Sequence, residues 1–125
     1  MTAHILLVED EIKLAKLLEL DLCDHGYDVN VVHDGLSGWQ QAQDGSPDLI
    51  VLDWQLPLLT GPEICARLRA AGRTMPIIFT TALDDPEHRA TALQAGANEY
   101  LVKPFGIDVL LQKIVTHLNH VPSAA

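Results

Sequence analysis

The chain has 125 residues, enough for one domain built around a single hydrophobic core. Its 17 Asp and Glu residues outnumber its 8 Lys and Arg residues, and the resulting formal charge of −9 argues against direct binding of a nucleic acid backbone. No apolar run approaches the length of a membrane span and the N-terminus does not resemble a signal peptide, so we expect a cytoplasmic protein with no membrane segment.

Short apolar runs alternate with helix-like segments along the chain, five of each. The first, third and fourth runs are nearly continuous in Ile, Leu, Val and Phe, as the central strands of a parallel sheet require. The second and fifth runs are more mixed, which suits edge strands. The five runs cover residues 4–8, 28–32, 48–52, 75–80 and 99–102.

Apolar periodicity and capping residues predict the helices. Segment 12–25 places four leucines on one helical face, and segment 107–118 carries a second apolar stripe. Segment 62–71 is preceded by Thr60 and contains Glu63, which can form a capping box. The leucines of the first stripe are Leu14, Leu17, Leu18 and Leu22.

Segment 86–95 is the weakest of the predicted helices. Asp85 can cap it and Pro86 can start it, but its apolar side is mostly alanine plus Leu93. A helix with so little to bury should be the least firmly docked.

The two cysteines do not form a C-x-x-C pair and lie in helix-like segments. We interpret Cys23 and Cys65 as small buried apolar residues in a reducing compartment, rather than as a disulfide or a metal site.

The regular alternation predicts an α/β fold with a parallel sheet, right-handed crossovers and helices on both faces. In such sheets, ligands bind beyond the carboxyl ends of the strands. Polar residues stand at these positions in this chain: Glu9, Asp10, Asp53, Thr80, Thr81 and Lys103.

These residue types together predict phosphoryl chemistry. Carboxylates from two neighbouring strands would repel one another without a cation, and oxygen ligands without His or Cys favour Mg²⁺. A lysine and a hydroxyl opposite them can receive the oxygens of a phosphoryl group. We therefore interpret Asp53 as a nucleophile exposed at the tip of its strand.

Each residue also has an ordinary explanation when it is taken singly. An acidic pair can simply face a helix N-terminus, and threonine suits a strand. The indication of a site comes from their joint appearance after alternate runs.

Four motifs make the chain resemble the receiver domain of two-component response regulators, and most of all the receivers of winged-helix DNA-binding regulators. The motifs are LLVEDE (6–11), LDWQLPLLTG (52–61), TTALDD (80–85) and GANEYLVKPF (96–105). The resemblance covers residues 3–120 as one receiver domain and leaves 121–125 as a linker or tail. It implies a flavodoxin-like, doubly wound sheet of five parallel strands in the order 2-1-3-4-5, with five helices.

The resemblance also implies roles for individual residues. Asp53 matches the residue that is phosphorylated, and Lys103 the lysine that pairs with the phosphoryl group. Thr81 matches the switch hydroxyl and Tyr100 the switch aromatic. Pro104 matches a proline preceded by a cis peptide bond.

A magnesium site is implied in the same way. Asp10 and Asp53 match direct ligands of Mg²⁺, and the third protein ligand is the main-chain carbonyl of Gln55. Glu9 matches an acidic neighbour that acts mostly through water.

The function implied is that of a phosphoacceptor switch rather than an enzyme, with at most slow self-dephosphorylation. A histidine kinase would transfer its phosphoryl group to Asp53 with Mg²⁺, and the changed conformation would control an output, transcription being the expected one. Winged-helix regulators also imply a homodimer through the 86–118 face. DNA would be reached only through an output domain that is not present in this chain.

Two other functions fit parts of the pattern. A phosphatase-type hydrolase with an aspartyl nucleophile usually carries a second acid two residues later, where this chain has Gln55. A phosphate-independent interaction module on the same fold usually lacks one of the acidic residues or the lysine, and this chain has them all.

Overall fold

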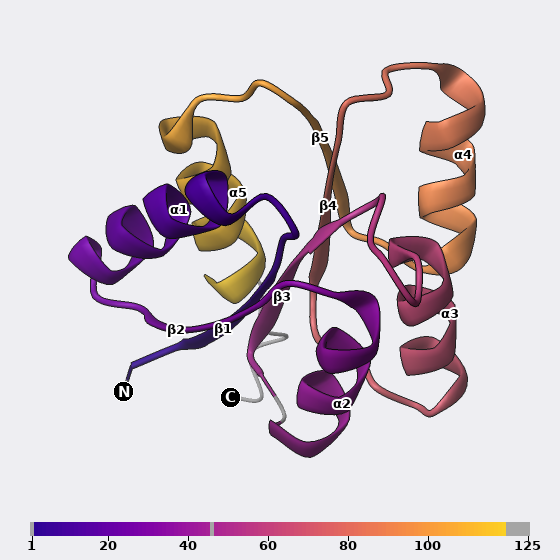
Figure 1. Cartoon of the computed structure of the whole chain (residues 1–125), viewed down its shortest axis with the longest axis horizontal. Coiled ribbons are helices and arrows are strands. Elements are labelled where there is room, and N and C mark those ends of the chain that lie inside the picture. Colours follow the sequence, from indigo (N-terminus) through magenta and orange to yellow (C-terminus); the bar gives the residue numbers. More distant parts are fainter. Residues whose placement is uncertain (1, 46, 120–125) are drawn as a thin grey trace.

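A computed structural model of the chain, described over residues 2–45 and 47–119, contains five strands that alternate with five helices (Figure 1). The strands are β1 (His4–Val8), β2 (Asp28–Val32), β3 (Leu49–Asp53), β4 (Ile77–Thr81) and β5 (Glu99–Val102). The helices are α1 (Ile12–Asp24), α2 (Gly35–Gly45), α3 (Gly61–Ala70), α4 (Pro86–Ala95) and α5 (Ile107–Asn119). The predicted strands are therefore confirmed, although β3 and β4 each end one residue later than expected, at Asp53 and Thr81, and β4 begins two residues later. The tail at 121–125 lies outside the described residues.

All strand pairs are parallel, and the sheet order is β2-β1-β3-β4-β5. This confirms the predicted order and makes β1 and β3 neighbours at the centre of the sheet. The order of the strands reverses at this point, which is where sheets of this kind bind ligands. Val8 is paired with Leu52, and Asp53 is paired with Thr80, so the carboxyl ends of β1, β3 and β4 lie side by side.

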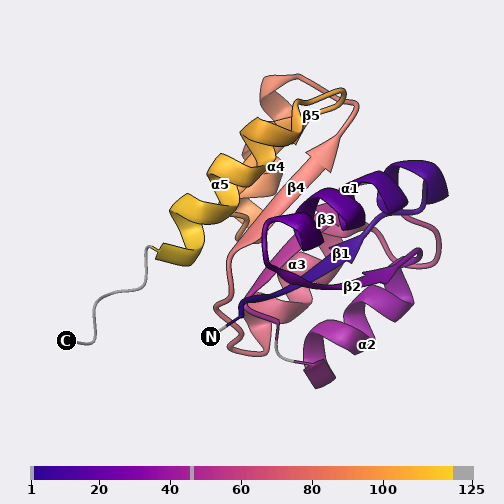
Figure 2. The same cartoon turned by 90° about the vertical axis from the view of Figure 1, so that its left-hand side faces the viewer.

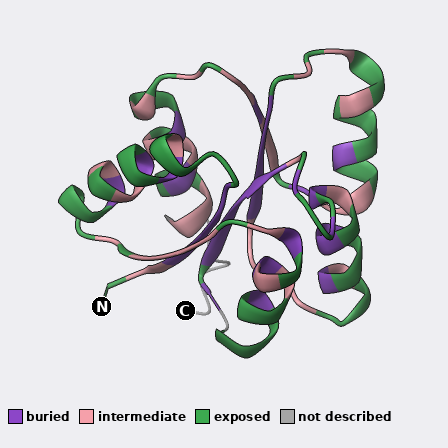
Figure 3. Cartoon of the chain, viewed as in Figure 1, coloured by how far each residue is buried: buried purple, intermediate pink, exposed green. Residues whose placement is uncertain are grey.

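Helices cover both faces of the sheet: α1 and α5 lie on one side, and α2, α3 and α4 on the other (Figures 1 and 2). Alternate side chains of each central strand enter the two layers. Ile5 and Leu7 of β1 pack in the core under α1 and α5, whereas Leu6 and Val8 pack in the core under α2, α3 and α4. Burial on both faces explains why the central strands are apolar throughout (Figure 3).

Capping fixes the first turns of α3 and α4. The Thr60 hydroxyl accepts a hydrogen bond from the Glu63 N–H, and the Glu63 carboxylate accepts one from the Thr60 N–H, which confirms the predicted capping box. The Asp85 carboxylate accepts a hydrogen bond from the His88 N–H at 2.9 Å, which confirms the predicted cap of α4.

Three expectations about burial were wrong. Leu17 and Leu93 are 61% and 63% exposed, and Cys23 is exposed, whereas Cys65 is buried. In α1 the buried face runs through Ala15, Leu18 and Leu22, and Leu17 lies beside that face rather than on it. Helix periodicity predicts a stripe but not its edges, because a shift of one residue rotates a side chain by about 100°.

Helix α4 buries little apolar surface, as its sequence predicts. Ala92 is the one buried residue within Pro86–Ala95, and Leu93 points away from the core. The capped first turn therefore holds α4 at one end, while its apolar contact with the sheet is small.

None of the helices in the described part of the chain is long and apolar enough to cross a membrane.

We predict that Thr60→Ala lowers the free energy of unfolding by about 1 kcal/mol, because it removes the hydroxyl that accepts the Glu63 N–H. Thr116→Ala is the matched control. The Thr116 hydroxyl donates to the Gln112 carbonyl inside α5, where alanine is the better helix former, so this change should cost nothing. Urea denaturation of both variants measures the difference, and equal losses would contradict the capping role of Thr60.

Candidate functional site

The polar residues singled out in the sequence come together at the carboxyl ends of the central strands. Glu9 and Asp10 follow β1, Asp53 is the last residue of β3, and Thr81 is the last residue of β4. Lys103 follows β5 and reaches over the ends of these strands toward Glu9. The sheet order therefore brings together side chains that are up to 94 positions apart in the sequence.

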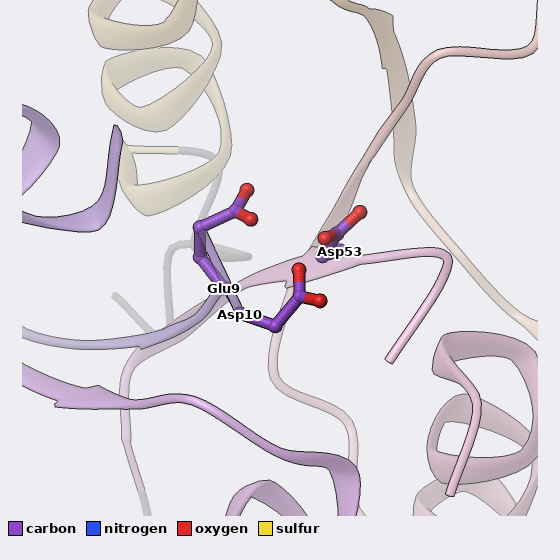
Figure 4. Close-up of side chains that lie close together, drawn as sticks. All are labelled: Glu9, Asp10 and Asp53. Atoms are coloured by element: carbon purple, nitrogen blue, oxygen red, sulfur yellow. The ribbon is translucent and has the colours of Figure 1, made fainter. Parts of the chain in front are cut away.

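Three carboxylates form the floor of the site. One oxygen from each of Glu9, Asp10 and Asp53 lies within 4.8 Å of the other two, and Figure 4 shows the three groups gathered between the ends of β1 and β3. Glu9 is 1% exposed, whereas Asp10 is exposed to solvent.

Asp53 is buried, at 5% exposure, and the expectation that it stands exposed at a strand tip was wrong. The reason is that β3 continues through Asp53, which pairs with Thr80 in the sheet instead of lying beyond it. Its carboxylate consequently lies beside Glu9 and under Lys103.

Lys103 is the cation that faces this cluster. Its Nζ lies 2.7 Å from Glu9 Oε1 and 3.5 Å from Asp53 Oδ1. Burial works against the charge of this ammonium group, but its hydrogen bond with Glu9 and the charges of Asp53 and Glu9 raise the pKa of Lys103 overall. Lys103 therefore stays protonated at neutral pH.

Asp53 holds a proton more tightly than an ordinary aspartate. Burial and then the charge of Glu9 raise the pKa of Asp53 to about 7, although the charge of Lys103 acts in the opposite direction. One ammonium group thus does not neutralise three neighbouring carboxylates, and the site favours further positive charge.

The donor set fits a hard divalent cation. The cluster offers carboxylate oxygens from three residues and no imidazole or thiolate, which is the chemistry that Mg²⁺ prefers. Gln55, whose main-chain carbonyl is the third predicted ligand, lines a groove of about 530 Å³ together with Asp10. The side chain of Gln55 is exposed.

The two predicted switch residues are joined through the backbone of a third residue. The buried Thr81 hydroxyl accepts a hydrogen bond from the Leu83 N–H at 3.1 Å, and the Tyr100 hydroxyl donates to the Leu83 carbonyl. The ring of Tyr100 also lies 4.9 Å below the Arg89 guanidinium of α4. The sequence did not predict this role of Leu83, since its main-chain groups carry no side-chain signal.

Trp54 connects the end of β3 with α4. Its ring centroid lies 5.1 Å from that of Phe79, 5.4 Å from that of His88 and 6.1 Å from that of Tyr100. His88 is fixed in turn by Asp85, whose carboxylate lies 2.6 Å from the His88 Nδ1. This packing through His88 was not foreseen from the sequence.

Two further contacts shape the surroundings of the acidic cluster. The exposed His33 donates from Nδ1 to the main-chain carbonyl of Glu9 at 2.9 Å, which ties the end of β2 to the site. The Lys103–Pro104 peptide bond is cis, as the resemblance implies.

Comparison with known proteins agrees with this geometry. Residues 5–115 match the family model described as the response regulator receiver domain. The chain is 44% identical over 111 residues, 89% of its length, to the uncharacterized transcriptional regulatory protein YkoG of Bacillus subtilis (strain 168), covering 49% of that protein. It is 43% identical to the transcriptional regulatory protein CusR of Escherichia coli (strain K12), over 92% of this chain and 51% of CusR. The chain thus spans about half the length of the curated relatives it matches.

Among solved structures, the receiver domain of the Francisella response regulator 1452 superposes with a TM-score of 0.91 at 30% identity. The match covers 94% of this chain and 98% of that one.

We predict that Asp53→Asn stabilises the metal-free protein, on the order of 1 kcal/mol at pH 8, because it removes one of three crowded negative charges. Because its pKa is raised from 3.8 to about 7, the stability cost of ionising Asp53 builds up between these two pH values and is complete above about pH 7, so the gain should shrink below pH 7 and vanish near about pH 4. Thermal or urea unfolding in EDTA measures it.

The matched control is Asp28→Asn, which makes the same change of charge at an exposed residue where β2 begins. It should leave stability nearly unchanged. Added MgCl₂ should raise the melting temperature of the wild type more than that of Asp53→Asn, and a larger rise in the variant would contradict the cation-binding role of the cluster.

Proposed function

The chain belongs to the family of response regulator receiver domains, and from this premise we propose that Asp53 accepts a phosphoryl group from a phosphohistidine of a histidine kinase. The observation that carries the proposal is the pairing of a buried aspartate with an acidic pair on one side and a lysine ammonium group 3.5 Å away on the other. Receiver domains act as switches in two-component systems, and the proposal assigns the steps of that switch to residues of this chain.

The transfer step is a displacement at phosphorus. A carboxylate oxygen of Asp53 forms a bond to phosphorus as the bond from phosphorus to the imidazole nitrogen breaks, and the imidazole leaves with that electron pair. Lys103 pairs with the oxygens of the incoming group, since its Nζ already lies within 3.5 Å of Asp53. Glu9 and Thr81, which lie beside Asp53, are both buried, so little water would reach the reacting carboxylate.

We propose that Mg²⁺ is the cofactor, held by Asp10, Asp53 and the main-chain carbonyl of Gln55, with Glu9 acting mostly through water. When bound, Mg²⁺ supplies positive charge that neutralises the phosphoryl oxygens. The support for this assignment is the carboxylate cluster itself, whose charge one lysine does not balance.

The conformational step follows from the contacts of Thr81. A phosphoryl oxygen on Asp53 would accept a hydrogen bond from the Thr81 hydroxyl, which now accepts one from the Leu83 N–H. Movement of Thr81 would shift Leu83, and the Tyr100 hydroxyl bound to the Leu83 carbonyl would follow. Helix α4 begins three residues later and buries only Ala92, so it can move at small cost.

The named relatives also suggest which output the proposed switch controls and which partners it contacts. Because two relatives are named transcriptional regulatory proteins and are about twice as long, we propose that residues 3–120 form the receiver domain of a cytoplasmic regulator. Residues 121–125 would lead into an output domain that binds DNA, and the 86–118 face would form a homodimer. The protein would act as a switch with slow self-dephosphorylation rather than as an enzyme with turnover.

Acetyl phosphate tests the phosphorylation site. With MgCl₂, the wild type should gain the mass of one phosphoryl group, because acetyl phosphate is a small donor that needs no partner protein. Asp53→Asn should gain none, since an amide is not a nucleophile here. Absence of the mass gain in the wild type, or the same gain in Asp53→Asn, would contradict the proposal. Continued turnover of a phosphomonoester would favour a hydrolase instead.

Leu83 should slow the loss of the phosphoryl group. It lies two residues after Thr81 and is half-buried, so its apolar side chain would obstruct the water that attacks the acyl phosphate. Leu83→Asn and Leu83→Lys should therefore lose phosphate severalfold faster, measured as decay of the phosphorylated mass after acetyl phosphate is removed. An unchanged decay rate in both variants would count against this role.

A further inference from the structure

Leu58 combines a strained backbone with an exposed apolar side chain. Its φ is +75°, and the Leu59 N–H donates to the Pro57 carbonyl at 2.9 Å across it, which is the rare form of the γ-turn. The left-handed region is unfavourable for a branched apolar residue. At 78%, Leu58 is also the most exposed large apolar side chain in the part of the chain that the structure describes.

Contacts with the start of α2 hold the turn around Leu58 in place. Gly35, at the start of α2, donates its N–H to the Pro57 carbonyl at 2.9 Å. A Cβ on Gly35 would lie only 1.7 Å from the Leu59 carbonyl oxygen, so the two backbones are in direct contact. Leu56 and Leu59 are buried on either side of the turn. Leu58 therefore cannot relieve its exposure by turning inward.

The fold itself gains nothing from leucine at this position. Glycine adopts a positive φ without strain and would also remove the exposed apolar surface. Leu58 has both a strained backbone and an exposed apolar side chain next to the candidate site, and this combination indicates that its side chain contacts another molecule.

The position of the turn indicates that use. Pro57 lines the groove that also contains Asp10, Gln55 and Thr60, beside the acidic cluster. Asp53 is only 5% exposed at the floor, so a protein that brings a phosphohistidine to it must lie against this rim. Leu36, which follows Gly35, is 46% exposed and adds apolar surface next to the turn.

We propose that Leu58 is a docking contact for the protein that donates the phosphoryl group. In the complex, an apolar side chain of the donor, close to its phosphohistidine, covers Leu58. This inference rests on the proposed function of Asp53. Asp10 is exposed and lines the same groove as Pro57, so the donor presents a basic group beside its apolar contact. A second copy of this chain, with its charge of −9, would bring like charge to the rim and is disfavoured.

The test compares a protein donor with a small donor. Each histidine kinase of the source organism is autophosphorylated in turn, and the fastest donor to the wild type is used with Leu58→Gly. Loss of one buried leucine contact should lower kcat/KM for this transfer by about tenfold. Labelling by acetyl phosphate should not change, because this small donor has no side chain that could contact Leu58.

Three further measurements separate docking from a structural effect. Leu58→Gly should melt at a higher temperature than the wild type, since strain is removed, so slower transfer cannot come from unfolding. Leu58→Met keeps an apolar side chain and should retain most of the transfer rate. Leu93→Ala removes an equally exposed leucine from α4 and should transfer at the wild-type rate.

The outcomes distinguish this inference from the proposed function. Equal kinase transfer to the wild type and Leu58→Gly, with acetyl phosphate still labelling both, would overturn the docking contact alone. The docking contact would also be overturned if Leu58→Gly slowed transfer from the kinase and from acetyl phosphate by the same factor. It would be overturned as well if the wild type formed a concentration-dependent dimer that Leu58→Gly abolishes without slowing transfer. No labelling of the wild type by any donor would overturn the proposed function and this contact with it.

Discussion

The crowding of three carboxylates against one ammonium group is the interaction on which the rest of the site depends. One carboxylate oxygen from each of Glu9, Asp10 and Asp53 lies within 4.8 Å of the other two, and Lys103 contacts two of these residues. Such a cluster is unfavourable by itself, and it persists because the backbone of the central strands fixes each residue. A slip of one residue in the pairing of β1 with β3 would turn these side chains to the opposite face of the sheet. The strand register thus sets the charge of the site, and the charge sets the ligands that it accepts.

The same arrangement explains how a local change can reach the edge of the domain. The Thr81 hydroxyl and the Tyr100 hydroxyl both bind main-chain groups of Leu83, and Arg89 lies over the Tyr100 ring. These contacts connect β4, β5 and the first turns of α4. Because α4 buries only Ala92, its position depends on these polar and aromatic contacts more than on the hydrophobic core.

The sequence predicted the elements well, and it singled out polar residues that the fold brings together at one edge of the sheet, because both follow from local patterns. Continuous apolar runs marked the central strands, and Thr60 with Glu63 marked the start of α3. What it could not predict depends on tertiary packing. The burial of Asp53 follows from its pairing with Thr80, and the exposure of Leu93 and Cys23 from how each helix is rotated. Helix α2 gave little periodic signal because the residues it buries are Gly35, Gly38 and Ala42, which carry almost no apolar side chain.

The aromatic packing around Trp54 gives the domain a built-in optical reporter. Trp54 directly follows Asp53 in the chain and its ring lies beside His88 on α4, so a change at either place would alter the surroundings of one fluorophore. The other tryptophan, Trp39, lies on α2 with the Arg67 guanidinium 5.8 Å from its ring, and it packs against the same apolar core as Trp54. Emission from Trp54 would therefore report the proposed ion binding and helix displacement in the unlabelled protein, with a Trp39→Phe background removing the second signal.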